Sequence, residues 1–488
     1  MSRFNTAVKA TPDTINLALA PAYSLNDKTR LVTLLLGSFL KDQFYRSGDE
    51  TLAELQALVA TVEPTFAARA AIYARDTFGM RSVSHVVAAE LCRYVKGEQW
   101  LRHFLRRVVI RPDDVTEILA YWLATYGKPI PNAMKRGLGD ALSDFDGYRL
   151  GKYKAEGKKV SLVDAVNLCH PKHTEALAAL MNGTLVAPDT WEVELTRAGQ
   201  QEDVAAAKAA VWERLLREKQ LGYFALLRNL RNITEQAPSC VPMAAEQLRD
   251  PDAVRCSRVL PFRFLTAWEA VDVLRNRDLM LALSAATNVA VQNVPELPGR
   301  TLVAVDGSGS MQAYASHQTS PIAIAALFAA ALYRKGDADV LIFDDRTIWL
   351  QLNPADSVMT NAQKIRDRAQ AGGTNFNLIF DAATRPYDRV VILSDMQAWM
   401  KRERSNNVFF RGWGTGTSDP ATAAKDYRRR TGADPHIFCF DLAGYGTAQF
   451  PEPKVTQLCG WSDKAFDLML MLERGQDGIV KAVEEVVL

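Results

Sequence analysis

The sequence has little of what would place the protein in a membrane or outside the cell. No apolar run within its 488 residues reaches the length needed to span a bilayer, and the first residues, MSRFNTAVKATPDT, lack the apolar core of a signal peptide. We therefore expect a cytoplasmic protein. The six cysteines form no C-x-x-C pair and no zinc-ligand spacing, which predicts reduced, mostly buried thiols rather than a zinc site.

An excess of charge is also missing. The formal net charge is only +2, so there is no global signal for nucleic-acid binding, and any basic surface must be local. Hydrophobic residues make up 48% of the chain and charged residues 23%, which is ordinary for a globular protein. At this length the chain is too long for one core, so we expect two domains or more.

One stretch stands out, TLVAVDGSGSM at residues 301–311. Its apolar part is typical of a buried strand, and the small residues after it form a turn. Asp306, Ser308 and Ser310 offer oxygens at alternate positions, and the glycines between them leave the backbone free to bring the three together. Oxygen ligands suit a hard divalent cation, so these residues are candidate ligands of Mg²⁺ or Mn²⁺.

Two later segments fit the same site. Gly372-Gly373-Thr374 is a turn that presents a hydroxyl, and the apolar strand before Asp395 ends in a second aspartate. Ligands of a parallel sheet gather at the carboxyl ends of its strands, so Thr374 and Asp395 are expected above Asp306. A solvated turn remains the alternative for the first stretch alone, but the three segments in this order favour a metal site.

The same stretch argues against catalysis. A phosphate-binding loop needs a lysine that residues 307–311 lack. An aspartyl phosphotransferase would carry its acid/base aspartate where this chain has Ser308, and a two-metal nuclease needs more carboxylates than Asp306 and Asp395. We expect a protein that is not an enzyme.

At these residues the chain resembles the von Willebrand factor A domain and its metal-ion-dependent adhesion site. The family pattern D-x-S-x-S, then T, then D, is matched without departure by Asp306, Ser308, Ser310, Thr374 and Asp395. The resemblance implies that the first four contact the metal and that Asp395 acts through water. It also implies an α/β doubly wound domain, which we place at residues 296–488.

The chain before this domain has apolar residues at helical spacing. The spacing predicts successive helices with short joints over residues 25–43, 52–62, 65–78, 82–95, 99–109, 113–126 and 132–145. Such a series without a strict period is typical of an α-solenoid of the HEAT or armadillo kind, here residues 1–295.

Basic residues recur along these helices. One cluster, Arg102 to Arg111, follows a helix and its exit, and another occupies the loop-like stretch 147–159, which contains Lys152 and Lys154. The ordinary interpretation of each is a solvated face. His170, before Pro171, is expected to be extended at a helix end with Lys172 close by, although a helix C-cap is the commoner role for such a histidine. Arg228 and Arg231 lie on the flank of the helix predicted at 221–234, an arrangement that can also be structural.

Several segments together resemble the TROVE module of the Ro autoantigen family. They are Gly151-Lys152-Tyr153-Lys154, DAVNLCHPK at 164–172, ALLRNLRNIT at 225–234 and LPFRF at 260–264. A TROVE module followed at once by a von Willebrand A domain is that family's architecture, so the resemblance spans nearly the whole chain. Within the family, the chain resembles the bacterial Ro-like proteins.

The resemblance implies a monomeric ring of helical repeats with a positively charged central hole. Family members bind single-stranded 3′ ends of misfolded RNAs in the hole and Y-type small RNA on the outer surface, acting in RNA quality control, and bacterial relatives tether polynucleotide phosphorylase. By position, Lys152 or Lys154 and His170 match the family's Y RNA contacts. Residues 157–161 replace a stretch that commonly contains an aromatic, which favours ionic contacts there.

The sequence is compatible with alternatives at two points. The polar segment between Asp395 and Pro435 is expected to be either a loop that faces RNA or protein, or a disordered stretch. The alternative function is a metal-dependent protein-docking module on a helical scaffold, without RNA.

Overall fold

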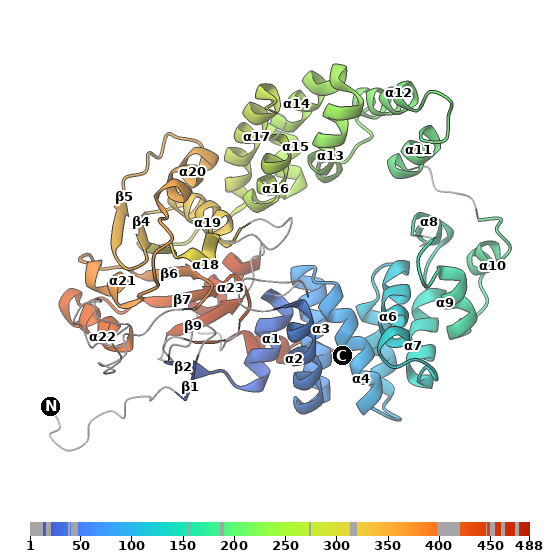
Figure 1. Ribbon diagram of the computed structural model, residues 1–488, viewed down its shortest axis with the longest axis horizontal. Coiled ribbons are helices and arrows are strands. Elements are labelled where there is room, and N and C mark those ends of the chain that lie inside the picture. The colour runs from blue at the N-terminus through green and yellow to red at the C-terminus, as the bar shows by residue number, and fades with distance from the viewer. Residues whose placement is uncertain are drawn as a thin grey trace, which may run out of the picture. The chain divides into compact units, whose positions relative to one another are not determined.

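The computed structural model describes residues 13–15, 21–37, 40, 47–153, 157–185, 190–272, 275–312, 320–397, 420–445, 447–448, 454–459, 464–473 and 478–488. Its residues fall into a helical unit, Asp49–Asn293 with Ile479–Leu488, and a sheet unit, which contains the chain up to Gly48 and from Val294 to Gly478 (Figure 1).

The helical unit consists of short amphipathic helices joined by tight turns. They are α2 (Gly48–Thr61), α3 (Pro64–Phe78), α4 (Ser82–Tyr94), α5 (Gln99–Val108), α6 (Pro112–Thr125), α7 (Asn132–Ser143), α8 (Gly147–Lys152), α9 (Leu162–Cys169), α10 (Glu175–Met181), α11 (Trp191–Ala198), α12 (Val204–Arg217), α13 (Tyr223–Gln236), α14 (Val241–Arg249), α15 (Pro251–Ser257), α16 (Pro261–Asp272), α17 (Arg277–Ala290) and α24 (Gly478–Glu484). The helices expected between residues 52 and 145 are therefore present, and α8 lies in the stretch that we expected to be a loop.

Local sequence explains where these helices begin and end. In α3, the Glu63 carboxylate accepts hydrogen bonds from the backbone N–H groups of Thr65 and Phe66, and Pro64 occupies the first turn, where it costs no hydrogen bond. Gly79 ends the helix in the left-handed conformation, at φ 68°. Such signals set the length of each helix, and its apolar stripe then decides which face is buried.

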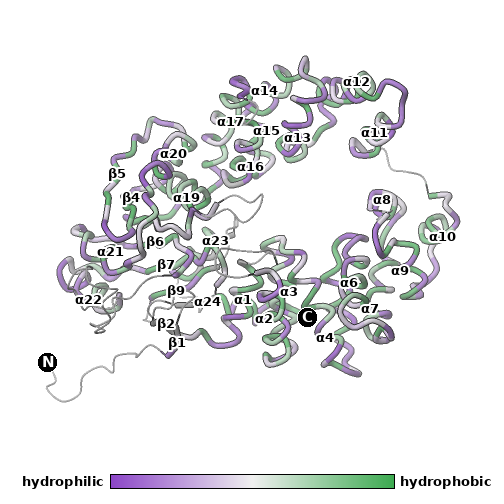
Figure 2. The backbone as a smooth tube through the Cα atoms, in the orientation of Figure 1, coloured by the Kyte–Doolittle hydropathy of each residue, from purple (hydrophilic) through white to green (hydrophobic). Residues whose placement is uncertain are grey.

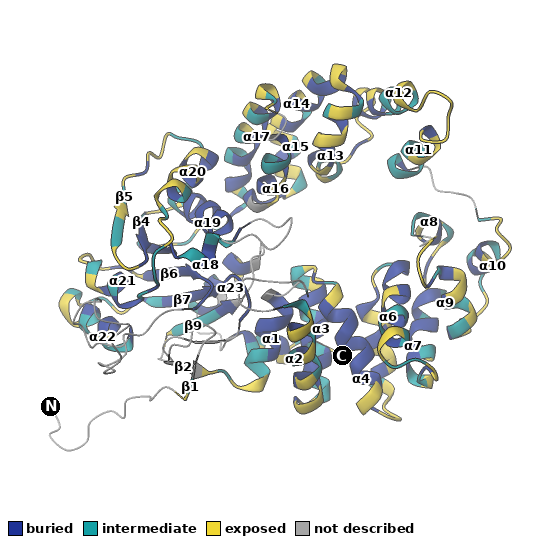
Figure 3. Cartoon of the chain, viewed as in Figure 1, coloured by how far each residue is buried: buried dark blue, intermediate teal, exposed yellow. Residues whose placement is uncertain are grey.

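The helices bury one face each and expose the other. Figure 2 shows hydrophobic and hydrophilic residues alternating along them, and Figure 3 shows buried residues on the faces that meet neighbouring helices. In the second half of the unit, fully buried Trp212 and Phe264 belong to one continuous apolar core with residues from α12 to α17. Burial of such faces supplies most of the stability of helices this short.

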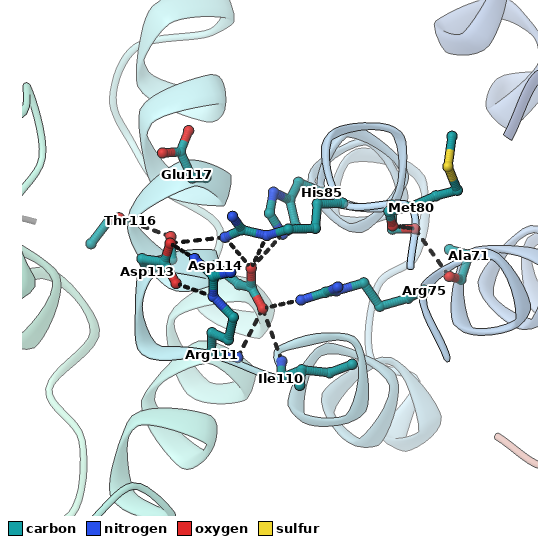
Figure 4. Close-up of polar contacts among 12 residues, drawn as sticks. Ala71, Arg75, Met80, His85, Ile110, Arg111, Asp113, Asp114, Thr116 and Glu117 are labelled. Carbon is teal, nitrogen blue, oxygen red and sulfur yellow. Dashed lines mark hydrogen bonds and ion pairs between the residues drawn. The ribbon is translucent and has the colours of Figure 1, made fainter. Parts of the chain in front are cut away.

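One charged network is buried among α3, α4 and α6 (Figure 4). The Asp114 carboxylate is fully buried and accepts hydrogen bonds from Arg75 at 2.8 Å and from Arg81 at 2.6 Å. His85 Nε2 lies 3.1 Å from the same carboxylate. The backbone N–H groups of Ile110 and Arg111 complete its partners at 3.0 and 2.9 Å. Both oxygens of the carboxylate thus have several hydrogen-bond partners, which is the condition for burying a charge.

The sheet unit is built on six strands in the order β5-β4-β3-β6-β7-β9. The strands are β3 (Thr301–Asp306), β4 (Ala338–Phe343), β5 (Thr347–Leu350), β6 (Arg389–Ser394), β7 (His436–Asp441) and β9 (Val455–Cys459). All neighbours are parallel except β5, which is antiparallel to β4. The sheet is therefore mixed, whereas the sequence predicted a parallel one, because the turn after β4 is too short for a crossover and forms a hairpin.

Helices cover both faces of this sheet (Figure 1). They are α18 (Gly309–Gln312), α19 (Pro321–Lys335), α20 (Val358–Arg368), α21 (Asn377–Ala382), α22 (Pro420–Thr431) and α23 (Lys464–Glu473). Side chains of α21 and α22 share a core with one face. On the other, Phe328 of α19 contacts Phe440 of β7 and stacks on Phe466 of α23. Strands β3 and β6 are buried throughout, as a two-sided covering requires.

The segment expected to be a loop after Asp395 contains a helix. Helix α22 covers the sheet with buried Ala423, Ala424 and Tyr427, and the Tyr427 hydroxyl accepts a hydrogen bond from the Tyr387 N–H at 2.9 Å. The segment was therefore predicted wrongly in part, because its many arginines mask a narrow apolar stripe. Residues 398–419 lie outside the described part of the chain.

The two units do not divide the chain at a single point, in contrast to the expected domains 1–295 and 296–488. Strand β2 (Pro21–Ser24) pairs with β1 (Thr14–Ile15) and with β8 (Thr447–Ala448), and α1 (Asp27–Gly37) packs near β9, so both belong to the sheet unit. At the other end of the chain, Arg107 donates a hydrogen bond to the carbonyl of Val487 within the helical unit.

The expectations about membrane-spanning segments and cysteines can be compared with the described residues. None of the helices in the described ranges is long and apolar enough to cross a bilayer. The cysteines whose side chains are described are free, and all are buried except Cys256.

Candidate metal and RNA sites

The first loop of the candidate metal site leaves the centre of the sheet. Strand β3 lies between β4 and β6 and ends at Asp306, which is fully buried. The Asp306 carboxylate accepts a hydrogen bond from the Ser308 N–H at 2.9 Å, and the hydroxyls of Ser308 and Ser310 lie 3.3 Å apart. A Cβ atom on Gly307 would lie 2.9 Å from Ile342, so this position needs glycine. The loop therefore folds back and brings its three oxygen-bearing side chains together.

The second loop, which carries Thr374, lies directly beside the first. The Ala371 N–H donates to the Gly307 carbonyl at 2.9 Å, and Ser308 forms a parallel bridge with Gly372. A Cβ atom on Gly372 would lie 3.0 Å from the Asp344 carboxyl carbon, so glycine lets the loop approach this closely. Thr374 itself is buried.

The third loop follows β6, the strand next to β3. Ser394 donates a hydrogen bond from its hydroxyl to Asp306 Oδ2 at 2.5 Å, which ties the two strand ends together. Asp395 is buried, and its Oδ1 accepts from the Gln397 N–H at 3.1 Å. Its Oδ2 is buried without a hydrogen-bond partner. The five residues predicted as metal ligands thus lie in three adjoining loops at one edge of the sheet.

The electrostatics of this edge are those of two buried acids close together. Burial, and next the negative charge of Asp395, raise the pKa of Asp306 to about 7 against the opposing effect of the Ser394 and Ser308 hydrogen bonds. Burial also raises the pKa of Asp395. Each of two such carboxylates disfavours ionisation of the other, whereas a cation bound between them would favour ionisation of both.

The donor set suits a small hard cation. Among the residues described, no three His, Cys, Asp or Glu side chains form a group that could hold a metal, so hydroxyl groups would have to contribute. Two carboxylates and three hydroxyls supply oxygen alone, as Mg²⁺ and Mn²⁺ prefer. The unpartnered Oδ2 of Asp395 is one acceptor that such an ion, or water bound to it, would satisfy.

Sequence reasoning missed two further aspartates at the same edge. Asp344 and Asp441 stand at the ends of β4 and β7, as Asp306 and Asp395 stand at the ends of β3 and β6, and both are buried. Asp344 accepts from the Arg346 N–H at 2.9 Å, and Asp441 from the Gly444 N–H at 2.6 Å. The signal was present in the sequence, since each follows an apolar strand. Both cap their own loops.

The first group of predicted RNA-binding residues lies at the ends of α8 and α9. Lys152 is partly buried and pairs with Glu192 at 3.5 Å, while Lys154 lies outside the described residues. His170 and Lys172 are exposed. His170 caps α9 in the left-handed conformation, at φ 50°, and its N–H donates to Val166. The extended backbone expected before proline is wrong here, because ending the helix requires the left-handed turn.

The second group lies on α13. Arg228 is exposed, and Arg231 pairs with Glu235 at 2.8 Å. The sequence did not single out their neighbour Phe224, which is 44% exposed and whose ring centre lies 5.8 Å from the Arg228 guanidinium carbon. The spacing of four residues between them was the available signal, since it places both on one helix face.

The arginine cluster around α5 has a structural role. Arg102 pairs with Asp140 and Arg106 with Asp144, both in forked geometry. The next two arginines pair as well, with Asp76 and Asp113. Since every one of these guanidiniums has an acidic partner, the cluster bridges helices and contributes little free positive charge.

Comparison with family models identifies one domain family in this chain. The model of the TROVE domain matches residues 38–185 and 181–319, which together make up more than half of the chain and extend past β3. The telomerase protein component 1 of Rattus norvegicus and that of Mus musculus are each 22% identical over 341 residues, or 51% of this chain. The matched part is only 13% of the length of these relatives.

A solved structure shares the fold. The crystal structure of the Ro (RSR) protein of Deinococcus radiodurans superposes with a TM-score of 0.60 and 20% sequence identity, over 92% of this chain and 100% of that one.

Proposed function

The chain belongs to the TROVE domain family, and we propose that it is a Ro-like protein that binds non-coding RNA. The observation that carries this proposal is the family match over the helical unit. The superposition on a Ro protein along nearly the whole chain supports the same fold, including the sheet unit.

We propose, more narrowly, that the helices form a monomeric ring closed by the sheet unit. The hole of the ring takes single-stranded 3′ ends of misfolded RNA, and the outer surface takes a Y-type small RNA. The exposed side chains of His170, Lys172 and Arg228 support this proposal, because each can donate hydrogen bonds to a phosphate. Such a protein works in RNA quality control in the cytoplasm, by delivery to an exoribonuclease such as polynucleotide phosphorylase and without catalysis of its own.

We propose further that the sheet unit is a von Willebrand factor A domain that holds Mg²⁺, or Mn²⁺, at the loops described above. Asp306, Ser308, Ser310 and Thr374 would contact the ion, and Asp395 would act through water. A metal held by so few charges remains electrophilic, so it would take a carboxylate or phosphate oxygen of a partner. The buried and unpartnered Oδ2 of Asp395 supports this assignment.

The RNA proposal is tested by titrating the purified protein with two hairpin RNAs, one with a single-stranded 3′ tail and one blunt. We expect the tailed RNA to bind more tightly, with little dependence on tail sequence, because backbone and free ends are read rather than base edges. We also expect the logarithm of the binding constant to fall with the logarithm of salt, by about 0.7 for each single-strand phosphate contacted. Equal binding of the two RNAs, or binding that salt does not weaken, would contradict the proposal.

A further inference from the structure

A partly exposed aromatic side chain of the helical unit lies close to two arginines. Phe224 lies in the first turn of α13 and is 44% exposed, although Leu226, Leu227 and Leu230 of the same helix are buried in the core. The Arg228 guanidinium carbon lies 5.8 Å from the ring centre and that of Arg263 5.9 Å. We call these three residues the Phe224 platform.

Two helices build the platform, and the core beneath fixes their positions. Phe224 and Arg228 are one turn apart on α13, whereas Arg263 comes from the first turn of α16. Beside them, Tyr223 meets Phe264 edge to face with ring centres 6.3 Å apart, and its hydroxyl donates to the Leu248 carbonyl at 2.8 Å. The platform is therefore held by rigid elements, and little order has to be gained when a ligand binds.

The charges of the platform are not neutralised. Neither Arg228 nor Arg263 has an acidic partner among the described residues, whereas the nearby Arg231 pairs with Glu235 and Arg255 with Asp252. Two free guanidiniums attract anions. Because both lie within about 6 Å of the centre of one ring, the anion would arrive beside a partly exposed aromatic side chain.

A single-stranded nucleotide matches both features. Its base stacks on aromatic rings, and its phosphates accept hydrogen bonds from guanidinium groups. An acidic peptide would use the two charges but would leave the ring exposed to water. We propose that the Phe224 platform is a stacking site for one nucleotide of single-stranded RNA, with Arg228 and Arg263 on the flanking phosphates. This proposal rests on the proposed RNA-binding function and names a contact within it.

The test uses the full-length protein and a single-stranded RNA that carries 2-aminopurine, a base whose fluorescence falls when it stacks. Phe224→Ala should weaken binding roughly 5- to 150-fold, the range for loss of one base–aromatic stack, and should abolish the fluorescence change. Phe224→Tyr keeps the ring and should restore both. In the double variant Arg228→Ala with Arg263→Ala, the logarithm of the binding constant should fall less steeply with the logarithm of salt. The slope should be smaller by about 1.4, or about 0.7 for each lost phosphate contact.

Two matched controls separate the site from general effects of surface substitution. Leu281→Ala removes an exposed apolar side chain from the same unit, and Arg106→Ala removes an exposed arginine that is already paired with Asp144. Neither should change RNA affinity by as much as twofold. Circular dichroism of each variant verifies that the helices remain folded.

The outcomes distinguish this proposal from the proposed function. If Phe224→Ala binds as tightly as wild type, with the fluorescence change intact, the stacking site is overturned while RNA binding stands. If wild type binds no RNA, both fail. Binding of an acidic peptide by the two arginines, with no response from 2-aminopurine, would replace the stacking site with a protein-docking one.

Discussion

At the scale of single residues, Asp114 has the most demanding environment in the helical unit. Burial by itself would raise its pKa, but the hydrogen bonds and charges of His85 and Arg75 outweigh burial and hold the pKa of Asp114 well below its usual range. The carboxylate also receives two backbone N–H groups, from Ile110 and Arg111 (Figure 4). Ionisation of Asp114 therefore stabilises the folded state relative to the unfolded chain.

Removing this charge should cost much of the unit's stability. Asp114→Asn leaves Arg75, which is 7% exposed, without its partner, and we expect a loss of about 3 to 5 kcal/mol in the free energy of unfolding at pH 7. Asp144→Asn, whose partner Arg106 is exposed, should cost less than about 1 kcal/mol. Urea unfolding followed by circular dichroism measures both.

The sign of the pH dependence follows from the lowered pKa of Asp114. Its contribution is fully present above the pKa of the unfolded aspartate, about 3.9, and is lost progressively as the pH falls below that value. Wild type should therefore lose stability more steeply than Asp114→Asn below about pH 4. Equal slopes for the two proteins, or equal costs for Asp114→Asn and Asp144→Asn, would contradict this account of the network.

At the scale of elements, the candidate metal site depends on where strands end. Asp306 and Asp395 terminate neighbouring parallel strands, and β3 and β6 are in register from Thr301 opposite Arg389 to Val305 opposite Leu393. The two aspartates are therefore brought to the same edge. The helices and loops after them decide which hydroxyls join, and Thr374 arrives by the loop that bonds to Gly307.

The metal proposal predicts a calorimetric difference between two aspartates of the sheet unit. Wild type should bind one Mg²⁺ or Mn²⁺ ion, and Asp306→Ala should abolish the binding because the carboxylate at the end of β3 is lost. Asp337→Ala removes an exposed carboxylate from the loop before β4, outside the candidate metal site, and should leave binding unchanged. Absence of metal binding by wild type under conditions that preserve its fold, or undiminished binding by Asp306→Ala, would refute the site.

Elements were predictable where one rule dominated. Apolar spacing predicted the helices up to residue 145, and a strand with a terminal aspartate predicted the grouping of Asp306 with Asp395. Predictions were wrong where two rules competed. The proline after His170 favours an extended backbone at His170, yet ending α9 required the left-handed conformation there. In α22 the charge of three consecutive arginines hid the stripe that includes Tyr427. The sequence did not single out Phe224, because its second arginine neighbour, Arg263, comes from α16, which is remote in sequence.

At the scale of the whole molecule, the two units are each completed by residues far away in the chain. Strand β2 joins the sheet unit through β8, and the chain end joins the helical unit through the bond from Arg107 to Val487. Pairings over such separations leave no local signature in one sequence, which is why the sequence could not assign residues 13–48 to the sheet unit. The order along the chain, helical segments first and alternating strands and helices after them, was still enough to indicate the family.

The central claim is that this TROVE family member carries RNA, and the most direct measurement is crosslinking in its native cell with sequencing of the attached RNA. Wild type is compared with His170→Ala and Lys154→Glu, and with Arg106→Ala as a control whose side chain is already paired. We predict that wild type and control yield a small stem-loop RNA together with structured RNAs bearing free 3′ tails, and that the first two variants lose the stem-loop RNA. Recovery of no RNA above background would contradict the account and favour a metal-dependent protein-docking module.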